Sequence, residues 1–210
     1  MQEEKFVSNE FLHYYKQCFN KYGATPKGIS WPDKLDNEIR YAKMINVVDQ
    51  LYKITNLSLL DVGCGYGGLL DYMIDNSINI KYIGLDLVPE SITYAREKHH
   101  ETQFHIMDAL DMDYDECFDY VVNNGIFTLK NDVSNIHMDK FVRTLIKKMF
   151  KAARVGIAFN MFSTHVNFFS NKNFYKNPLE TLAFCLSELS NNIKIDHSYK
   201  LFEYTVYVYK

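Results

Sequence analysis

The sequence predicts an α/β fold in which helices cover both faces of a mainly parallel, doubly wound sheet. Three observations support this prediction. From residue 58 onward, short apolar runs alternate with amphipathic helical patterns, which is the rhythm of β-α-β units. A glycine-rich segment at 63–68 follows the first apolar run, and an acidic residue lies at or just after the end of each of the first three runs.

Five strands and three helices are expected in the central part of the chain. The strands are predicted at LLDV, KYIGLD, QFHIM, FDYVVN and VGIAFN, and the helices at 67–75, 90–98 and 138–152. The last of these helices carries a stripe of apolar side chains spaced by three or four residues: Met138, Phe141, Val142, Leu145 and Met149. We expect this face to pack in the core.

The two ends of the chain depart from this pattern. A helix with an aromatic face is expected from about Glu4 to Lys21, and a turn-rich stretch from Tyr22 to Pro32 separates it from an amphipathic helix spanning Leu35 to Tyr52. At the other end, a helix with leucines at 179, 182, 186 and 189 precedes IKID and a last strand near 202–209. These closing strands are too near one another in sequence for a crossover helix, so we expect an antiparallel hairpin.

Length and composition favour a single domain. A chain of 210 residues that is 47% hydrophobic and 15% aromatic is large enough for one core and short for two. We therefore predict one domain at 1–210, with a helical arm or lid at 1–32 and the doubly wound core at 33–210. Whether the protein is a monomer or a homodimer stays open.

Charge and cysteine content exclude several classes of partner. The net charge of -3, with scattered Lys and Arg, lacks the basic surface that a nucleic acid requires. The first residues are acidic and polar, and no apolar run is long enough to span a membrane. Four widely spaced cysteines form no CxxC pair. We expect a cytoplasmic protein without a disulfide framework, a membrane or a nucleic-acid partner.

The segment LLDVGCGYGG at 59–68 contains two overlapping cofactor patterns. Gly63, Gly65 and Gly68 satisfy GxGxxG, which is typical of dinucleotide sites. Asp61 with Gly63, Gly65 and Gly67 satisfies DxGxGxG, a pattern suited to S-adenosylmethionine, whose charged methionine tail carries no phosphate. In both cases the glycines allow a ligand to approach bare backbone. This loop alone leaves both cofactors open.

Three acidic residues in phase favour the methyl donor. Asp61 lies where its carboxylate can attract the amino group of the methionine tail, and Asp86 where it can accept both ribose hydroxyls of either cofactor. Asp108 follows the third strand, where it can accept the adenine amino group while Met107 and Ala109 bracket the ring. The alternative is that each Asp merely caps a turn, which three acids in phase disfavour.

Four segments, in this order and spacing, resemble the class I S-adenosylmethionine-dependent methyltransferases: LLDVGCGYGG, YIGLDLVPESITYARE, FHIMDAL and FDYVVNNGIF. The resemblance covers about residues 57–160. It implies a Rossmann-like sheet of seven strands in the order 3-2-1-4-5-7-6 with the last strand antiparallel, in agreement with the hairpin. The core cofactor-binding residues that we assign are Asp61, Gly63, Gly65, Asp86, Leu87, Met107, Asp108, Ala109, Asn123 and Asn124.

The segment WPDKLDNEIRYA resembles family members in which the helix before the first strand contacts the cofactor. By this resemblance Arg40 reaches the methionine carboxylate and Trp31 covers the site. His13 and Tyr15 are catalytic candidates, because an aromatic arm can face the acceptor; the alternative is that this face only packs. No metal is predicted, since the acidic run at 108–116 is typical of a solvated loop.

The expected function is methyl transfer from S-adenosylmethionine to a small-molecule acceptor, with S-adenosylhomocysteine as product. The segment NNGIF lacks the Asn/Asp-Pro-Pro-aromatic pattern of enzymes that methylate base amino groups. We favour O-methylation of a sugar, a phosphorylated metabolite or a surface-polysaccharide precursor. Three alternatives remain: a non-catalytic S-adenosylmethionine-binding module, an NAD(P)-dependent oxidoreductase, and aminopropyl transfer from the decarboxylated donor, which a carboxylate contact from Arg40 would oppose.

Overall fold

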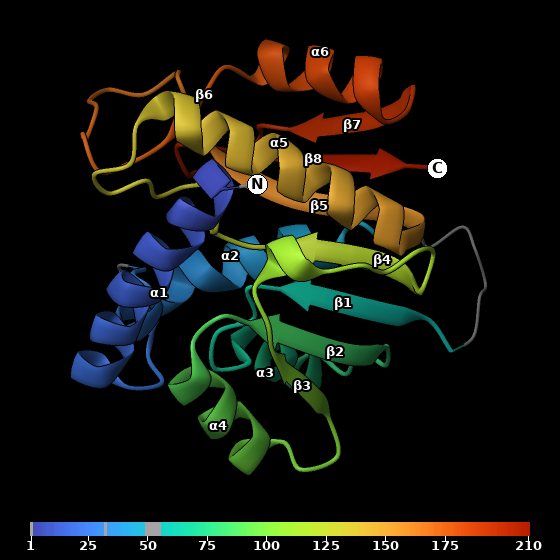
Figure 1. Ribbon diagram of the computed structural model, residues 1–210. Helices are drawn as coiled ribbons and strands as arrows, with labels where there is room; N and C mark the ends of the chain where they lie inside the picture. Colours follow the sequence, from blue (N-terminus) through green and yellow to red (C-terminus); the bar gives the residue numbers. More distant parts are fainter. Residues whose placement is uncertain (1, 32, 49–55) are drawn as a thin grey trace.

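The computed structural model describes residues 2–31, 33–48 and 56–210. Within them, one mixed sheet runs through the molecule with helices on both of its faces (Figure 1). The predicted α/β architecture is confirmed.

The sheet has the predicted strand order. Its strands are β1 (Ser58–Val62), β2 (Lys81–Asp86), β3 (Gln103–Ile106), β4 (Phe118–Asn123), β5 (Ala153–Ser163), β6 (Tyr175–Lys176), β7 (Asn192–Asp196) and β8 (Glu203–Tyr209). They follow the order β3-β2-β1-β4-β5-β8-β7, and β6 pairs with β5 off this path. Strand β8 is antiparallel to both β5 and β7, whereas the other pairs are parallel. The order 3-2-1-4-5-7-6 is therefore confirmed, with the last two numbers raised by one because the short β6 precedes them.

The helices cover the two faces of the sheet in two groups. They are α1 (Gln2–Tyr22), α2 (Lys34–Ile45), α3 (Gly68–Asp75), α4 (Pro89–Lys98), α5 (Asn135–Ala152) and α6 (Pro178–Glu188), with 3-10 turns η1 (Pro26–Ile29) and η2 (Ala109–Asp111). Met44, Leu69 and Ile92 from α2, α3 and α4 belong to one buried cluster, while Leu145 and Cys185 from α5 and α6 belong to the other. Helices thus cover both faces of the sheet, as predicted for a doubly wound fold.

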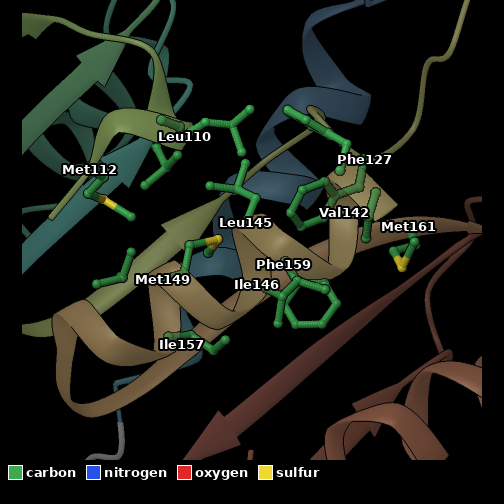
Figure 2. Close-up of a cluster of buried hydrophobic side chains, with 14 of the residues drawn as sticks. Leu110, Met112, Phe127, Val142, Leu145, Ile146, Met149, Ile157, Phe159 and Met161 are labelled. Carbon is green, nitrogen blue, oxygen red and sulfur yellow. The ribbon is translucent and has the colours of Figure 1, made fainter. Parts of the chain in front are cut away.

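The predicted core stripe of α5 is confirmed. Met138, Phe141, Val142, Leu145 and Met149 are all buried. Figure 2 shows three of them among the side chains that fill the space between α5 and the sheet. Each large side chain removed from water in this way contributes about 1.5–3 kcal/mol to folding, so this helix is firmly attached to the sheet.

The ends of the chain contain the predicted elements with two differences. Strands β7 and β8 form the expected antiparallel hairpin. Helix α6 is present, but it buries Thr181, Phe184 and Cys185 rather than its leucines, and Leu179 is 72% exposed. Helix α2 ends at Ile45, and Tyr52, the end that the sequence predicts for it, lies outside the described residues.

Candidate functional site

A first cavity lies at the edge of the sheet where the parallel strands β1, β2 and β4 end, and residues of α1 and η1 also line it. This edge is where doubly wound sheets bind ligands. Ten of the twelve predicted cofactor residues line the cavity: Trp31, Asp61, Gly63, Gly65, Asp86, Leu87, Met107, Asp108, Ala109 and Asn124. The fold therefore gathers residues that are up to 93 positions apart in the sequence into one site.

The glycine loop after β1 forms the floor of this cavity. Gly63 and Gly65 have φ angles of +79° and +54°, which side chains of L-residues rarely tolerate. A Cβ atom at Gly63 would lie 2.5 Å from Ile126 Cδ1, and one at Gly65 would lie 3.0 Å from Ile29 Cγ2. The backbone N–H of Gly63 donates to the Leu85 carbonyl oxygen over 2.8 Å, which holds the loop against the end of β2. Both glycines are thus required by the local geometry.

Two acidic side chains lie beside this loop: Asp61 is buried and Asp86 is half-buried. Asp86 accepts hydrogen bonds from the backbone N–H groups of Gly65 and Val88, each over 2.8 Å. Burial raises the pKa of Asp86, and these N–H groups oppose that rise. Asp61 accepts a hydrogen bond of 2.7 Å from the Tyr82 hydroxyl. Burial raises the pKa of Asp61 to about 7, so a nearby cation would favour its charged form.

Asp108 joins the cavity to the N-terminal arm. One carboxylate oxygen accepts from the backbone N–H of Leu110 over 2.9 Å and from the Ser8 hydroxyl over 3.1 Å. The other oxygen lies 2.7 Å from the Lys5 ammonium, which also lies 2.6 Å from Asp111. Helix α1 is therefore fixed over the cavity by the same acid that the sequence assigns to the adenine.

The arm is also attached at two further points. Lys16 of α1 lies 2.7 Å from Glu90 of α4, and Glu3 lies 2.6 Å from Lys140 of α5. Solvent and salt screen these pairs at the surface, so they add little to the attachment of the arm. Most of the attachment comes instead from packing, because Val7 and Phe11 of α1 are buried in the hydrophobic core.

Asn123, the last residue of β4, and Asn124, which follows it, have different surroundings. Asn123 is buried and donates from its amide nitrogen to the Val62 carbonyl oxygen over 2.8 Å, which ties β4 to β1. It does not line the first cavity, whereas Asn124 does. The side-chain oxygen of Asn124 is buried and has no hydrogen-bond partner among the described residues. It is therefore available to a ligand.

A second cavity adjoins the first. Tyr15, Ile29 and Trp31 line both. The other lining residues come from α2, β5 and the start of β8 and from the chain after η1, after β4, before β6 and before β8: Ser30, Asp36, Arg40, Thr128, Leu129, Phe162, Asn173, Lys200, Leu201, Phe202 and Glu203. A molecule in one cavity would lie next to a molecule in the other.

Arg40 lies in the wall of the second cavity and not of the first. Its guanidinium forms a buried ion pair with Glu203, with Nε 3.0 Å from Oε1, and stacks on the Trp31 ring at 3.7 Å. Asn160 donates to the other oxygen of Glu203 over 2.7 Å and accepts from the Gly125 N–H over 2.8 Å. This network links α2, β5, β8 and the chain after β4.

The two catalytic candidates are placed differently. Tyr15 lies at the boundary of the two cavities, and burial raises its pKa, so its phenol stays protonated at neutral pH. His13 is exposed, hydrogen-bonds to Gln17 over 2.9 Å and lines neither cavity. Within 2–31, 33–48 and 56–210, no three or more His, Cys, Asp or Glu side chains come together in a group that could hold a metal ion.

Comparison with known proteins identifies the family. A family model described as a methyltransferase domain matches residues 54–204, which is most of the chain. The chain belongs to the class I S-adenosylmethionine-dependent methyltransferases. The matched residues include the glycine loop, Asp61, Asp86 and Asp108, so the cofactor of this methyltransferase is S-adenosylmethionine, as the three acids in phase indicated.

Two curated relatives are similar in sequence. A Mycobacterium tuberculosis protein named as a methyltransferase is 27% identical over 158 residues, which cover 73% of this chain and 93% of that one. A malonyl-[acyl-carrier protein] O-methyltransferase of Acetivibrio thermocellus is 30% identical over 93 residues, 43% of this chain. That match spans about a third of the O-methyltransferase, 32% of its length.

Solved structures share the fold. The magnesium protoporphyrin IX methyltransferase of Synechocystis with bound SAH superposes with a TM-score of 0.64 at 13% identity, covering 99% of both chains. A phosphoethanolamine N-methyltransferase of Haemonchus contortus has a TM-score of 0.62 at 16% identity over 88% of this chain and 46% of its own. At these identities the likeness concerns the architecture alone.

Several lining residues were missed by the sequence analysis. They come from α1, η1, α2, α4, the chain after β4 and the segment before β8: Ser8, Phe11, Leu12, Gly28, Ile29, Tyr41, Ser91, Gly125 and Lys200. The turn-rich stretch Tyr22 to Pro32 was a usable indication for Gly28 and Ile29, because compact turns beside a ligand edge often close a site. The remaining residues depend on contacts between distant segments.

Proposed function

We propose that this methyltransferase transfers the methyl group of S-adenosylmethionine to an oxygen atom of a small-molecule acceptor. A sugar, a phosphorylated metabolite and a surface-polysaccharide precursor are the acceptor types that we favour. The observation that carries the proposal is the second cavity, which adjoins the cofactor cavity and shares Tyr15, Ile29 and Trp31 with it. Cavities that meet in this way can hold donor and acceptor in contact.

The first cavity fits the cofactor on three local observations. The bare backbone of Gly63 and Gly65 is open where a Cβ would clash, which leaves room for the methionine tail. The buried Asp61 carboxylate suits the cationic amino group of that tail. Asp86 suits the ribose hydroxyls, since each of its oxygens accepts one backbone N–H and retains a further lone pair.

The rest of the assignment follows the strand ends. We assign the adenine to Asp108, Met107 and Ala109, with Leu87 beside the ribose. The adenine amino group would share Asp108 with the donors from α1. Asn124, whose amide oxygen is unpartnered among the described residues, is assigned to the polar part of the cofactor near β4. Asn123 supports it by joining β4 to β1.

The protein's own contribution to the reaction is alignment and the exclusion of water. When bound, S-adenosylmethionine supplies a methyl group activated by a sulfonium cation. Trp31, Ile29 and Tyr15 of α1 line both cavities, so the reacting atoms would meet among side chains that displace bulk water. Holding two reactants in line is worth about 7–11 kcal/mol through effective molarity. Tyr15 is assigned the role of a hydrogen-bond donor at the junction. His13, which lines neither cavity, has no part in it.

Calorimetric titration with S-adenosylmethionine, S-adenosylhomocysteine and NADH in parallel tests the proposal. Micromolar binding of the first two without NADH is expected. Binding of NADH alone would instead support the dinucleotide oxidoreductase. Transfer of label from methyl-labelled S-adenosylmethionine to small acceptors separates an enzyme from a module that only binds the cofactor, because such a module would bind and leave every acceptor unlabelled.

We propose a cytoplasmic setting and a monomer or homodimer. All four cysteines are free thiols, as expected in a reducing compartment. No helix among the described residues is both long and apolar enough to cross a bilayer. Fractionation of cells and size-exclusion chromatography with light scattering measure these two properties.

A further inference from the structure

Arg40 carries an unused hydrogen-bond donor in the wall of the second cavity. The residue is 4% exposed, and its Nη1 is buried with no hydrogen-bond partner among the described residues. Nε and Nη2 both bond to Glu203. Proteins satisfy nearly all buried polar groups, so a buried unpaired guanidinium nitrogen indicates that a ligand acceptor completes it.

The partner of Arg40 is already saturated. Glu203 is fully buried, and its two oxygens receive N–H groups from Arg40 and from Asn160. A buried ion pair is weak evidence for stability, because desolvation of both charges opposes their attraction. Here the ion pair and the Trp31 ring hold the Arg40 guanidinium in one place, and this fixes the position of its unpaired donor Nη1.

Further groups around the junction also donate. Lys200 lies exposed in the wall of the second cavity, and Tyr15 lies between the cavities with its phenol kept protonated by burial. Asp36, one helical turn before Arg40, adds a half-buried carboxylate to the same wall. The wall therefore carries no large excess charge, and its selectivity depends on where the donors of Arg40, Lys200 and Tyr15 converge.

We infer that the acceptor presents a carboxylate to the second cavity, held by Arg40 and Lys200, and that the product is a methyl ester. The inference rests on the proposed function and names its acceptor class, an acidic sugar or another small carboxylic acid. A carboxylate is already ionised at neutral pH, so no proton has to be removed before it attacks. An alcohol would need a base, which Glu203 cannot be because its oxygens hold Arg40, so Asp36 is the one other carboxylate among the described residues that line this cavity.

The reaction is balanced without a further reactant. One carboxylate oxygen gives an electron pair to the methyl carbon, the bond from that carbon to sulfur breaks, and sulfur keeps the bonding pair. The methyl ester and S-adenosylhomocysteine result. The second carboxylate oxygen would stay on Arg40 Nη1 and Lys200 throughout, which fixes the attacking oxygen in line.

Trp31 provides a direct readout that needs no turnover. It is the single tryptophan of the chain, lines both cavities and stacks on Arg40. Protein saturated with S-adenosylhomocysteine is titrated with benzoate and with benzamide, two probes of one shape that differ in charge. We expect the fluorescence change to give about tenfold or tighter binding of benzoate. Equal binding of the two probes, or none of either, would overturn the inference.

Three variants locate the binding groups. Arg40→Lys keeps a charge for Glu203 but loses Nη1, and Lys200→Gln removes an exposed charge that folding does not need. Each should weaken benzoate several-fold and leave benzamide and S-adenosylhomocysteine unchanged. Lys172→Gln is the matched control, because Lys172 is exposed, pairs with Asp132 at 2.6 Å and lines neither cavity. If Lys172→Gln weakened benzoate binding as much as Lys200→Gln does, the assignment of Lys200 would be overturned.

Product chemistry gives an independent test. Enzyme and methyl-labelled S-adenosylmethionine are incubated with a deproteinised metabolite extract, and the labelled products are treated with mild base. Label released as volatile methanol marks an ester and supports the inference, whereas base-stable label marks an ether or amine and overturns it. Failure of the wild-type protein to bind S-adenosylhomocysteine would instead reject the proposed function itself, so the two failures are distinguishable.

Discussion

Asp61 is a buried acid whose removal should stabilise the protein while weakening the cofactor site. Its side chain is 3% exposed, it accepts one hydrogen bond of 2.7 Å from Tyr82, and burial raises its pKa from 3.8 to about 7. Asp61→Asn removes the charge and keeps an oxygen for the Tyr82 hydroxyl. The variant therefore isolates the cost of the buried carboxylate.

The magnitude follows from linkage between protonation and folding. Because the pKa of Asp61 is higher in the native state, the native protein holds the proton more tightly than the unfolded chain does. The stability that this tighter proton binding gives the native state is fully present below about pH 4 and is lost as the pH rises through about 7. One pKa unit corresponds to 1.36 kcal/mol, so the free energy of unfolding of Asp61→Asn should exceed that of the wild type by at most about 4 kcal/mol at pH 8. Near pH 4 the two free energies of unfolding should be equal.

Urea unfolding of both proteins between pH 4 and pH 8 measures this difference directly, because the other carboxylates cancel in the comparison. Binding of S-adenosylhomocysteine should fall in the variant by about 1.5–3 kcal/mol, the range for a lost charge-assisted hydrogen bond. In the wild type, affinity should rise from pH 6 to pH 8 as the carboxylate ionises. A stability difference that stays constant with pH would refute the raised pKa of Asp61.

Three further predictions concern the floor and the cover of the first cavity. Asp86→Asn should weaken S-adenosylmethionine binding by about 1.5–3 kcal/mol in calorimetry, and full affinity in a folded variant would contradict the ribose assignment. Gly63→Ala would place a Cβ atom 2.5 Å from Ile126 at a residue whose φ is +79°, so the free energy of unfolding should fall by about 1–3 kcal/mol. An unchanged midpoint of urea unfolding would argue against this strain. Lys5→Ala removes a half-exposed ion pair with Asp108, costs at most about 1 kcal/mol of stability, and should speed release of S-adenosylhomocysteine in stopped-flow measurements; an unaltered release rate would mean that the arm does not cover the ligand.

The central sheet was predictable because its determinants are local. The α5 stripe follows from side-chain spacing, and the hairpin of β7 and β8 follows from the short chain between them. The orientation of α6 was not predictable in the same way. Its buried face is Thr181, Phe184 and Cys185, and the Thr181 hydroxyl lies 2.7 Å from the Tyr204 hydroxyl of β8. A row of leucines in a sequence does not reveal which partners a helix will meet.

The convergence of residues at the first cavity was more predictable from the sequence than the arrangement around it, for the same reason. Asp61, Gly63 and Asp86 are placed by the ends of adjacent parallel strands, so their convergence follows from topology. Arg40 was recognised as a site residue, but its place in the second cavity depends on Glu203, 163 positions later. The attachment of the arm likewise depends on Lys5 meeting Asp108 across 103 positions. Such long-range pairs leave no periodic pattern in a sequence.

The two buried acids of the site show how the fold distinguishes structural from ligand-binding charge. Glu203 receives the Arg40 guanidinium and the Asn160 amide, so the chain itself supplies its countercharge. The donor to Asp61 is the neutral Tyr82 hydroxyl, and the pKa of Asp61 rises to about 7 as a result of burial. Because an unbalanced buried charge is costly, a cation bound beside Asp61 would favour its ionised form, and this is the place that we propose for the amino group of the methionine tail.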